Sequence, residues 1–382
     1  MVPRYVARPG ATAVGHELVG RESMLADLTG KLATGTSVHL RAARRYGKSS
    51  VLEALVARLG GEGRPVLLLD VASVEDPADF TTKLVDAALG IDGLAAALEP
   101  LGLRPAGALD DAARRDGVAL LRRVLSGIGV ARGILALDEI SLLLRSVVKH
   151  HGTNDAWRDL LGVLNTGSGT LPQVIAGSTG LSAFARLHGL GDVLDHLVPV
   201  SLEPLDPADA RWLIEEMLLS DERRPMPDVA AAVLEHLGAA VPYFVHAFAD
   251  GLRSATSPGG AVTRAAVERL HARWVAGSAA TNVFAGYRLR NQAYARGCHE
   301  TAKAILDAVA RTPEGLPRSE LEAAFRSRPP AQAGVTLDVL LPCLCEDFDL
   351  IQIDGRWSFR SKLLRERWAQ GDRWLTATQA GQ

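Results

Sequence analysis

The sequence predicts an α/β protein in which a parallel sheet is covered by helices and is followed by two smaller parts. Apolar runs alternate with helical patterns over the first half of the chain, and after residue 206 the patterns become helical. A chain of 382 residues is too long for one ordinary core. We therefore expect an α/β core in residues 1–205, a helical lid in residues 206–296 and a third domain in residues 297–382.

Short, mostly apolar segments predict the strands of the core; the run at residues 65–71 is of the kind that a strand buried in a parallel sheet gives. Helical patterns separate them: the first ends at Gly60-Gly61, and a long alanine-rich stretch covers about residues 77–130. Strands that alternate with helices predict a parallel sheet with helices on both faces. The five runs lie at residues 36–41, 65–71, 133–137, 173–177 and 197–202.

The two C-terminal parts differ in pattern. Residues 207–276 are helical with breaks at 221–227 and 257–260, and no strand is expected there. The last part ends in two short strands around Asp354-Gly355, a strong signal for a two-residue turn. Three helices and a hairpin in this order predict a winged helix-turn-helix, with helices at 300–311, 318–326 and 333–346 and strands at 350–353 and 357–359.

Composition places the chain among ordinary globular proteins, with 47% apolar and 23% charged residues. A net charge of −2 gives no general attraction to nucleic acid or to anionic membranes. Residues 1–15 lack the apolar core of a signal peptide, and no apolar run is long enough to span a membrane. The three cysteines form no disulfide framework and are expected to be buried free thiols. We expect a cytoplasmic protein.

The segment Arg41–Ser50 has the setting of a phosphate-binding loop, because it follows a predicted strand and opens a helix. Gly47 allows close approach to the phosphates, Lys48 neutralises their charge, and the Ser49 hydroxyl is a magnesium ligand. The pattern G-x-x-x-x-G-K-[ST] has Ala42 in place of its first glycine, which costs on the order of 1 kcal/mol if that position needs a positive φ. The alternative is a helix start with an incidental Gly-Lys-Ser. The expected nucleotide contacts are Ala43, Arg44, Arg45, Tyr46, Gly47, Lys48, Ser49 and Ser50.

Polar residues at the ends of two later strands complete the predicted site. Asp138 and Glu139 end the apolar run 133–137, so Asp138 is expected to hold magnesium and Glu139 to polarise the attacking water. The alternative is a solvated acidic pair at a strand end. After the run 173–177, Ser178 is expected to sense the γ-phosphate, with Thr179 as second choice; ordinary turn capping is the alternative. We expect the catalytic residues to be Lys48, Glu139 and Ser178.

At these residues the sequence resembles the archaeal-type ATPases of the signal-transducing (STAND) branch of the AAA+ superfamily. Val19-Gly20-Arg21-Glu22 precedes the strand, and Arg44-Arg45-Tyr46-Gly47-Lys48-Ser49-Ser50 is similar to the family's double-arginine loop. The resemblance implies that Gly20 and Arg21 lie near the adenine, and that the lid motif Gly238…Pro242 closes over the base and ribose. It also implies a C-terminal winged helix, and it covers about residues 18–368.

Two questions stay open: which arginine acts on the transition state, and whether the third domain binds DNA. A transition-state arginine acts in cis or comes from another subunit, and the candidates are Arg44, Arg45, Arg145 and Arg186. The third helix of the predicted winged helix has no lysine or arginine, which argues against DNA reading. Basic residues follow the hairpin, either along a phosphate backbone or on a solvated helix face: Arg360, Lys362, Arg365, Arg367 and Arg373.

The sequence therefore predicts an enzyme that binds ATP and Mg²⁺, hydrolyses ATP slowly, and acts as a regulatory switch coupled to a protein partner or to self-association. The alternative is a DNA-associated ATPase of the origin or loader type, which binds duplex through the winged helix. A third class, an interaction module that has lost nucleotide binding, conflicts with the intact Lys48, Ser49, Asp138 and Glu139.

Overall fold

A computed structural model of the chain describes residues 5–101, 108–144, 161–165, 171–177, 181, 194–277, 283–284, 286–287, 298–330 and 334–371. The chain divides into two compact units. The sheet unit comprises residues 12–42 and 48–202, and the C-terminal unit comprises residues 1–11, 43–47 and 203–382. The predicted division into three domains remains a prediction.

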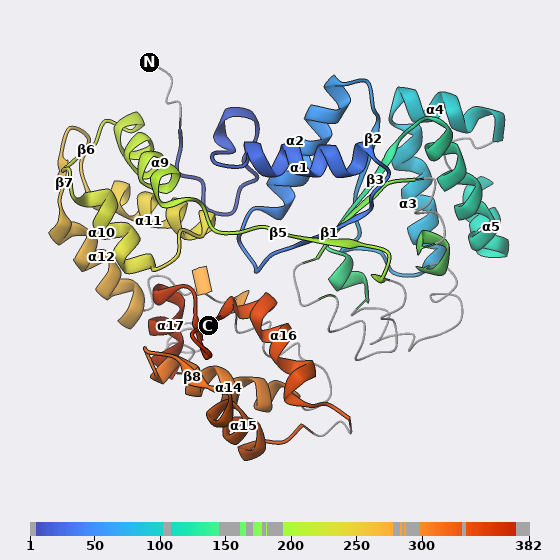
Figure 1. Cartoon of the computed structure of the whole chain (residues 1–382). Coiled ribbons are helices and arrows are strands. Elements are labelled where there is room, and N and C mark those ends of the chain that lie inside the picture. The colour runs from blue at the N-terminus through green and yellow to red at the C-terminus, as the bar shows by residue number, and fades with distance from the viewer. Residues whose placement is uncertain are drawn as a thin grey trace, which may run out of the picture. The chain divides into compact units, whose positions relative to one another are not determined.

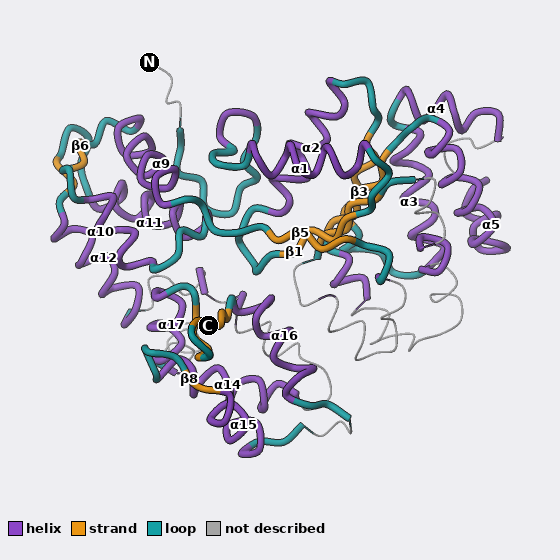
Figure 2. Tube along the Cα trace, in the orientation of Figure 1, coloured by secondary structure: helices purple, strands orange, loops and turns teal. Residues whose placement is uncertain are grey.

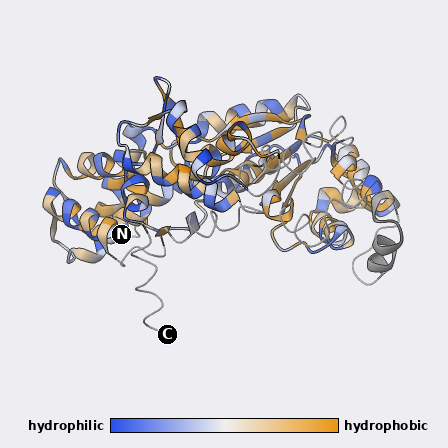
Figure 3. Ribbon diagram, turned by 90° about the horizontal axis from the view of Figure 1, so that it is seen from below, coloured by the Kyte–Doolittle hydropathy of each residue, from blue (hydrophilic) through white to orange (hydrophobic). Residues whose placement is uncertain are grey.

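The sheet unit is built on five strands in the order β2-β3-β4-β1-β5, and every neighbouring pair is parallel. Figure 2 shows these strands side by side in orange. All five residues of β3 are buried, and strands of the sheet are largely hydrophobic in Figure 3. The predicted parallel sheet is confirmed. Its strands are β1 (Val38–Arg41), β2 (Val66–Asp70), β3 (Ile134–Asp138), β4 (Gln173–Ala176) and β5 (Val198–Ser201).

Helix α3 of the sheet unit begins at a side-chain cap and ends at Gly90. Asp76 accepts a hydrogen bond from the backbone of Asp79 and Pro77 occupies the first turn, so α3 starts there. Phe80 and Leu84 of α3 are fully buried together with Leu121 of α5. The helices are η1 (Gly15–Glu17), α1 (Glu22–Ala33), α2 (Lys48–Gly61), α3 (Pro77–Leu89), α4 (Asp92–Leu98), η2 (Glu99–Leu101) and α5 (Ala108–Val130), as Figure 1 labels in part.

The first part of the C-terminal unit is helical, as predicted, but the expectation that it contains no strand is wrong. Two-residue strands, β6 and β7, pair in parallel between the helices. β6 lies in the first predicted helix break and β7 directly follows the second, and both are too short to give a periodic pattern. The elements are α9 (Pro207–Ser220), β6 (Arg224–Pro225), α10 (Val229–Leu237), α11 (Pro242–Ala255), β7 (Ala261–Val262) and α12 (Arg264–Ala276).

The last part has the predicted three helices and hairpin, plus β8, which the sequence did not reveal and which pairs with β10. Helix α16 buries Leu340, Leu341 and Leu344, as expected for a core helix. It ends because Asp349 adopts a left-handed φ of 57°. The winged-helix interpretation remains a prediction. The elements are α14 (Cys298–Arg311), β8 (Leu316–Pro317), α15 (Arg318–Ser327), α16 (Leu337–Phe348), β9 (Leu350–Ile353), β10 (Arg356–Phe359) and α17 (Lys362–Ala369).

Two expectations from composition can be compared with the structure. Within the described ranges, no helix combines the length and apolarity that crossing a membrane requires. The three cysteines are free thiols, and two of them, Cys298 and Cys343, are buried.

Candidate nucleotide-binding site

The predicted phosphate loop joins β1, which ends at Arg41, to α2, which begins at Lys48. Positive φ angles occur at Arg45 (75°) and Gly47 (89°), and Ala42 is not among the described residues with a positive φ. Alanine at position 42 therefore does not incur the backbone strain that a positive φ would impose. The strained residue is Arg45, since arginine disfavours the left-handed region.

Lys48 and Ser49 open α2 and point their polar groups at neighbours in the sheet unit. Lys48 is 7% exposed, and its Nζ donates a hydrogen bond to the Ala42 carbonyl at 3.0 Å. The Ser49 hydroxyl donates to Oδ2 of Asp138 at 2.6 Å. The positive end of the helix dipole adds to the charge of Lys48 at this point. The structure thus brings the loop lysine, the loop serine and the strand-end carboxylate together.

Asp138 is a buried carboxylate at the end of β3, with 8% of its surface exposed. Burial raises the pKa of Asp138, while the Ser49 hydroxyl, the Glu139 backbone N–H and Lys48 act in the opposite direction. A carboxylate oxygen beside a hydroxyl oxygen is the hard donor set that Mg²⁺ takes in proteins. The residues present therefore fit the predicted metal.

Glu139 directly follows β3 and has a left-handed φ of 58°. Its backbone N–H donates to Oδ1 of Asp138 at 2.8 Å, and its carbonyl accepts from the backbone of Leu142 at 2.8 Å. These bonds turn the chain sharply out of the strand. Left-handed geometry in a residue other than glycine is costly and concentrates at functional sites. The turn sets Glu139 next to the Asp138 carboxylate.

The remaining residues of the predicted nucleotide site lie near the ends of other strands and helices, or outside the described part of the chain. Gly177 follows β4 and packs against residue 141, since a Cβ on it would lie 3.2 Å from the Ser141 side chain. Ser50 accepts a hydrogen bond from the Ala13 backbone at 3.0 Å. Gly20 has a φ of 68°, and Arg21, 5% exposed, precedes α1. Four predicted residues lie outside the described part of the chain: Ser178, Thr179, Arg145 and Arg186.

The middle of the loop, Ala43–Gly47, belongs to the C-terminal unit, as does Pro242 at the start of α11. The Arg45 guanidinium lies 4.1 Å from the centre of the Tyr243 ring, and the Tyr243 N–H donates to the Arg45 carbonyl at 3.4 Å. The Tyr46 hydroxyl donates to Asp349. The sequence predicted phosphate contacts for these residues and did not reveal their contacts with the C-terminal unit.

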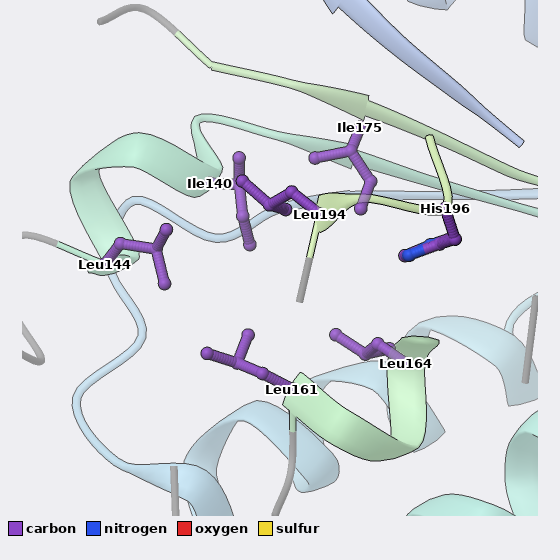
Figure 4. A pocket seen from close by; sticks show the side chains of 7 residues that line it. All are labelled: Ile140, Leu144, Leu161, Leu164, Ile175, Leu194 and His196. Carbon is purple, nitrogen blue, oxygen red and sulfur yellow. The ribbon is translucent and has the colours of Figure 1, made fainter. Parts of the chain in front are cut away.

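Each unit contains a cavity. The cavity in Figure 4 lies among Ile140, Leu161, His196 and further aliphatic side chains, and its volume of about 10 Å³ has room for about one water. The other, in the C-terminal unit, has a volume of about 310 Å³ and is lined in part by Gly238 and Ala240 of the predicted lid motif. The first cavity is too small for a nucleotide.

We compared the sequence and the fold of the chain with those of known proteins. No protein-family model and no curated protein matches the sequence. A Walker-type ATPase of Pyrococcus abyssi is similar in structure, with a TM-score of 0.65, 15% identity, and coverage of 95% of this chain and 99% of that one. The ORC2 protein of Aeropyrum pernix, solved in ADPNP–ADP complexes, has a TM-score of 0.51 and 12% identity, with 99% of both chains covered. The chain has the fold of AAA+ P-loop ATPases. At these identities the similarity concerns the fold alone.

Proposed function

We propose that the chain is an ATPase that binds ATP with Mg²⁺, hydrolyses it slowly, and works as a regulatory switch coupled to a protein partner or to a second copy. One observation carries the proposal: Lys48 and Ser49 open α2 while Ser49 hydrogen-bonds Asp138 at the end of β3. A loop lysine, a hydroxyl and a buried carboxylate are the groups that a nucleoside triphosphate and its metal require. The similar ORC2 protein, solved with ADPNP and ADP, supports the choice of ligand.

Each residue near the start of α2 has a role in binding. Lys48 neutralises the β- and γ-phosphates, helped by the positive end of the helix. Ser49 and Asp138 hold the metal through oxygen atoms. Magnesium, when bound there, supplies counter-charge for the phosphate oxygens. By resemblance, Gly20, Arg21 and Pro242 contact the adenine and ribose, and Ala43, Gly47 and the loop arginines lie along the phosphates.

Hydrolysis is assigned to Glu139, whose carboxylate accepts a proton from the attacking water as a general base. Its left-handed turn after β3 holds its backbone N–H on the Asp138 carboxylate. Ser178 senses the γ-phosphate, so that loss of this phosphate on hydrolysis changes the state of the protein. Slow turnover suits a switch, because each nucleotide state must persist long enough to bias a partner.

The DNA-binding alternative is less favoured, because two arginines of the predicted basic cluster are engaged inside the C-terminal unit. Arg367 is 1% exposed and donates to the carbonyls of Val275 and Gly277 at 2.8 Å. Arg360 pairs with Asp349 and with Glu203. Guanidinium groups held in this way are not available to phosphates, which supply most of the affinity for DNA. We therefore propose that the nucleotide state is passed on to a protein partner and not to DNA.

The test compares ATP binding and hydrolysis, with magnesium, in the wild type, Lys48→Ala and Glu139→Gln. We expect the wild type to bind and turn over slowly, Lys48→Ala to lose binding, and Glu139→Gln to bind without turnover. The absence of nucleotide binding by the wild type at millimolar ATP would refute the proposal. Equal binding by Lys48→Ala would refute the site.

A further inference from the structure

Tyr46, in the middle of the phosphate loop, and Asp349, at the end of α16, belong to the same compact unit although 303 residues separate them. The Tyr46 hydroxyl donates a hydrogen bond to Oδ2 of Asp349. Tyr46 is 2% exposed and Asp349 is 7% exposed. A buried hydrogen bond between a phenol and a carboxylate is costly to break, since both groups then lose a partner away from water.

Asp349 is itself fixed by the hairpin that follows it. It ends α16 in a left-handed conformation, and its carbonyl accepts from the Arg360 backbone at 2.9 Å, just beyond β10. Its Oδ1 lies 3.3 Å from Nε of Arg360, and Arg360 also pairs with Glu203. One carboxylate oxygen thus serves Arg360 while the other serves Tyr46. The loop tyrosine is tied to the strands of the hairpin through a single side chain.

The two residues before Tyr46 are held in the same unit. Tyr287 donates from its hydroxyl to the Arg44 carbonyl at 3.4 Å. Arg45 stacks on Tyr243 and accepts from its backbone. Three successive loop residues therefore have fixed positions, and Lys48 follows only two residues after Tyr46. Because the connection is so short, the backbone dihedral angles of Gly47 are the main ones that can change between the anchored tyrosine and the lysine.

We propose that Asp349 is a positioning residue for the nucleotide site: through Tyr46 it holds the phosphate loop in the conformation that accepts ATP. The inference rests on the proposed function and adds a route for its regulation. A loop that is held before binding loses less conformational entropy when the phosphates arrive. Because coupling between two sites is reciprocal, a partner that displaces the hairpin weakens ATP binding, and bound ATP steadies the hairpin.

The first measurement is ATP affinity, with magnesium, of the full chain carrying Tyr46→Phe, Asp349→Ala or Asp349→Asn. We expect Tyr46→Phe and Asp349→Ala to weaken binding about tenfold, the range typical of coupled sites. Asp349→Asn keeps one of the two accepting oxygens, and its NH2 group then faces Arg360 or Tyr46, so we expect an affinity between those of the wild type and Asp349→Ala. Tyr5→Phe, the same loss of a hydroxyl on the N-terminal segment of this unit, is the matched control.

The second measurement separates positioning from stability alone. Hydrogen exchange in the hairpin strands β9 and β10 should slow when ATP is added to the wild type and should not respond in Tyr46→Phe. Unchanged or tighter ATP binding by Tyr46→Phe would overturn the inference while leaving the proposed function intact. Failure of the wild type to bind ATP would overturn both. Weakened binding with an unchanged hairpin response would also overturn the inference.

Discussion

The Ser49 hydroxyl donates a hydrogen bond to Oδ2 of Asp138 at 2.6 Å, across 89 residues of sequence. Parallel pairing of the sheet explains this approach, because the carboxyl ends of parallel strands meet at one edge, where α2 also begins. Asp138 is buried, so its charge is costly there without a cation. The pair therefore supplies the oxygen atoms that the proposed magnesium site requires.

Asp138→Asn is expected to remove most of the magnesium dependence of ATP binding. The amide keeps an oxygen near Ser49 but loses the charge, and losing such a group weakens metal affinity roughly 10- to 100-fold. The check is an ATP titration with and without magnesium. Asp70→Asn, at the exposed end of the neighbouring strand β2, is the control. An Asp138→Asn protein with the full magnesium effect would remove this residue from the metal site.

The free energy of unfolding is expected to change with pH because Asp349 titrates differently in the folded and unfolded states. Burial raises its pKa to about 6, opposed by the Tyr46 hydrogen bond and by Arg360, with Glu203 adding a smaller upward effect. The folded state thus prefers the protonated carboxyl. This stabilisation is complete below the unfolded pKa of about 4 and is lost as the pH rises through about 6.

Asp349→Asn removes that titration, so the comparison is between the two proteins at each pH. The unfolding free energy of the wild type, relative to the variant, should fall by about 2–3 kcal/mol between about pH 4 and about pH 7. Denaturant titrations at several pH values measure it. A difference that is constant with pH would mean that Asp349 titrates normally in the folded protein.

Local patterns were enough to predict the sheet and the loop. The five segments predicted as strands each overlap a strand of the sheet, and the segment around Lys48 lies between β1 and α2 as expected. The fold of P-loop ATPases follows from these features, because a parallel sheet and a strand–loop–helix connection are both written in short stretches of sequence.

Contacts made over long separations could not be predicted in this way. Tyr46 and Asp349 are ordinary residue types with no pattern that pairs them, and only the fold brings them together. Arg367 was expected on a solvated face or along DNA, yet it is buried. The two-residue strands β6, β7 and β8 are too short to show the side-chain period of two that marks a strand.

Arg367→Met is expected to destabilise the C-terminal unit. The guanidinium donates to the carbonyls of Trp274, Val275 and Gly277 at the end of α12, and methionine leaves these acceptors without it. Loss of a buried charged donor costs about 3 kcal/mol. Thermal unfolding measures the effect, with Arg326→Met, whose side chain is 70% exposed, as the control. Equal stability with a loss of duplex binding would instead favour the DNA alternative.

Gly238→Ala is expected to destabilise the same unit more than Gly259→Ala does. Both glycines have nearly the same positive φ, 75° and 74°, so both variants carry a similar backbone cost of about 1 kcal/mol. They differ in space: a Cβ on Gly238 would lie 2.6 Å from the Lys362 backbone nitrogen, whereas nothing lies within 4 Å of one on Gly259.

The difference between these two variants isolates the close approach of α10 to the start of α17. Overpacking against backbone adds about 1–3 kcal/mol, because the backbone of Lys362 cannot move aside as a side chain can. Denaturant unfolding of both proteins gives the comparison directly. If the two variants lose the same stability, the close approach of Gly238 to Lys362 does not contribute to the cost, and this prediction is wrong.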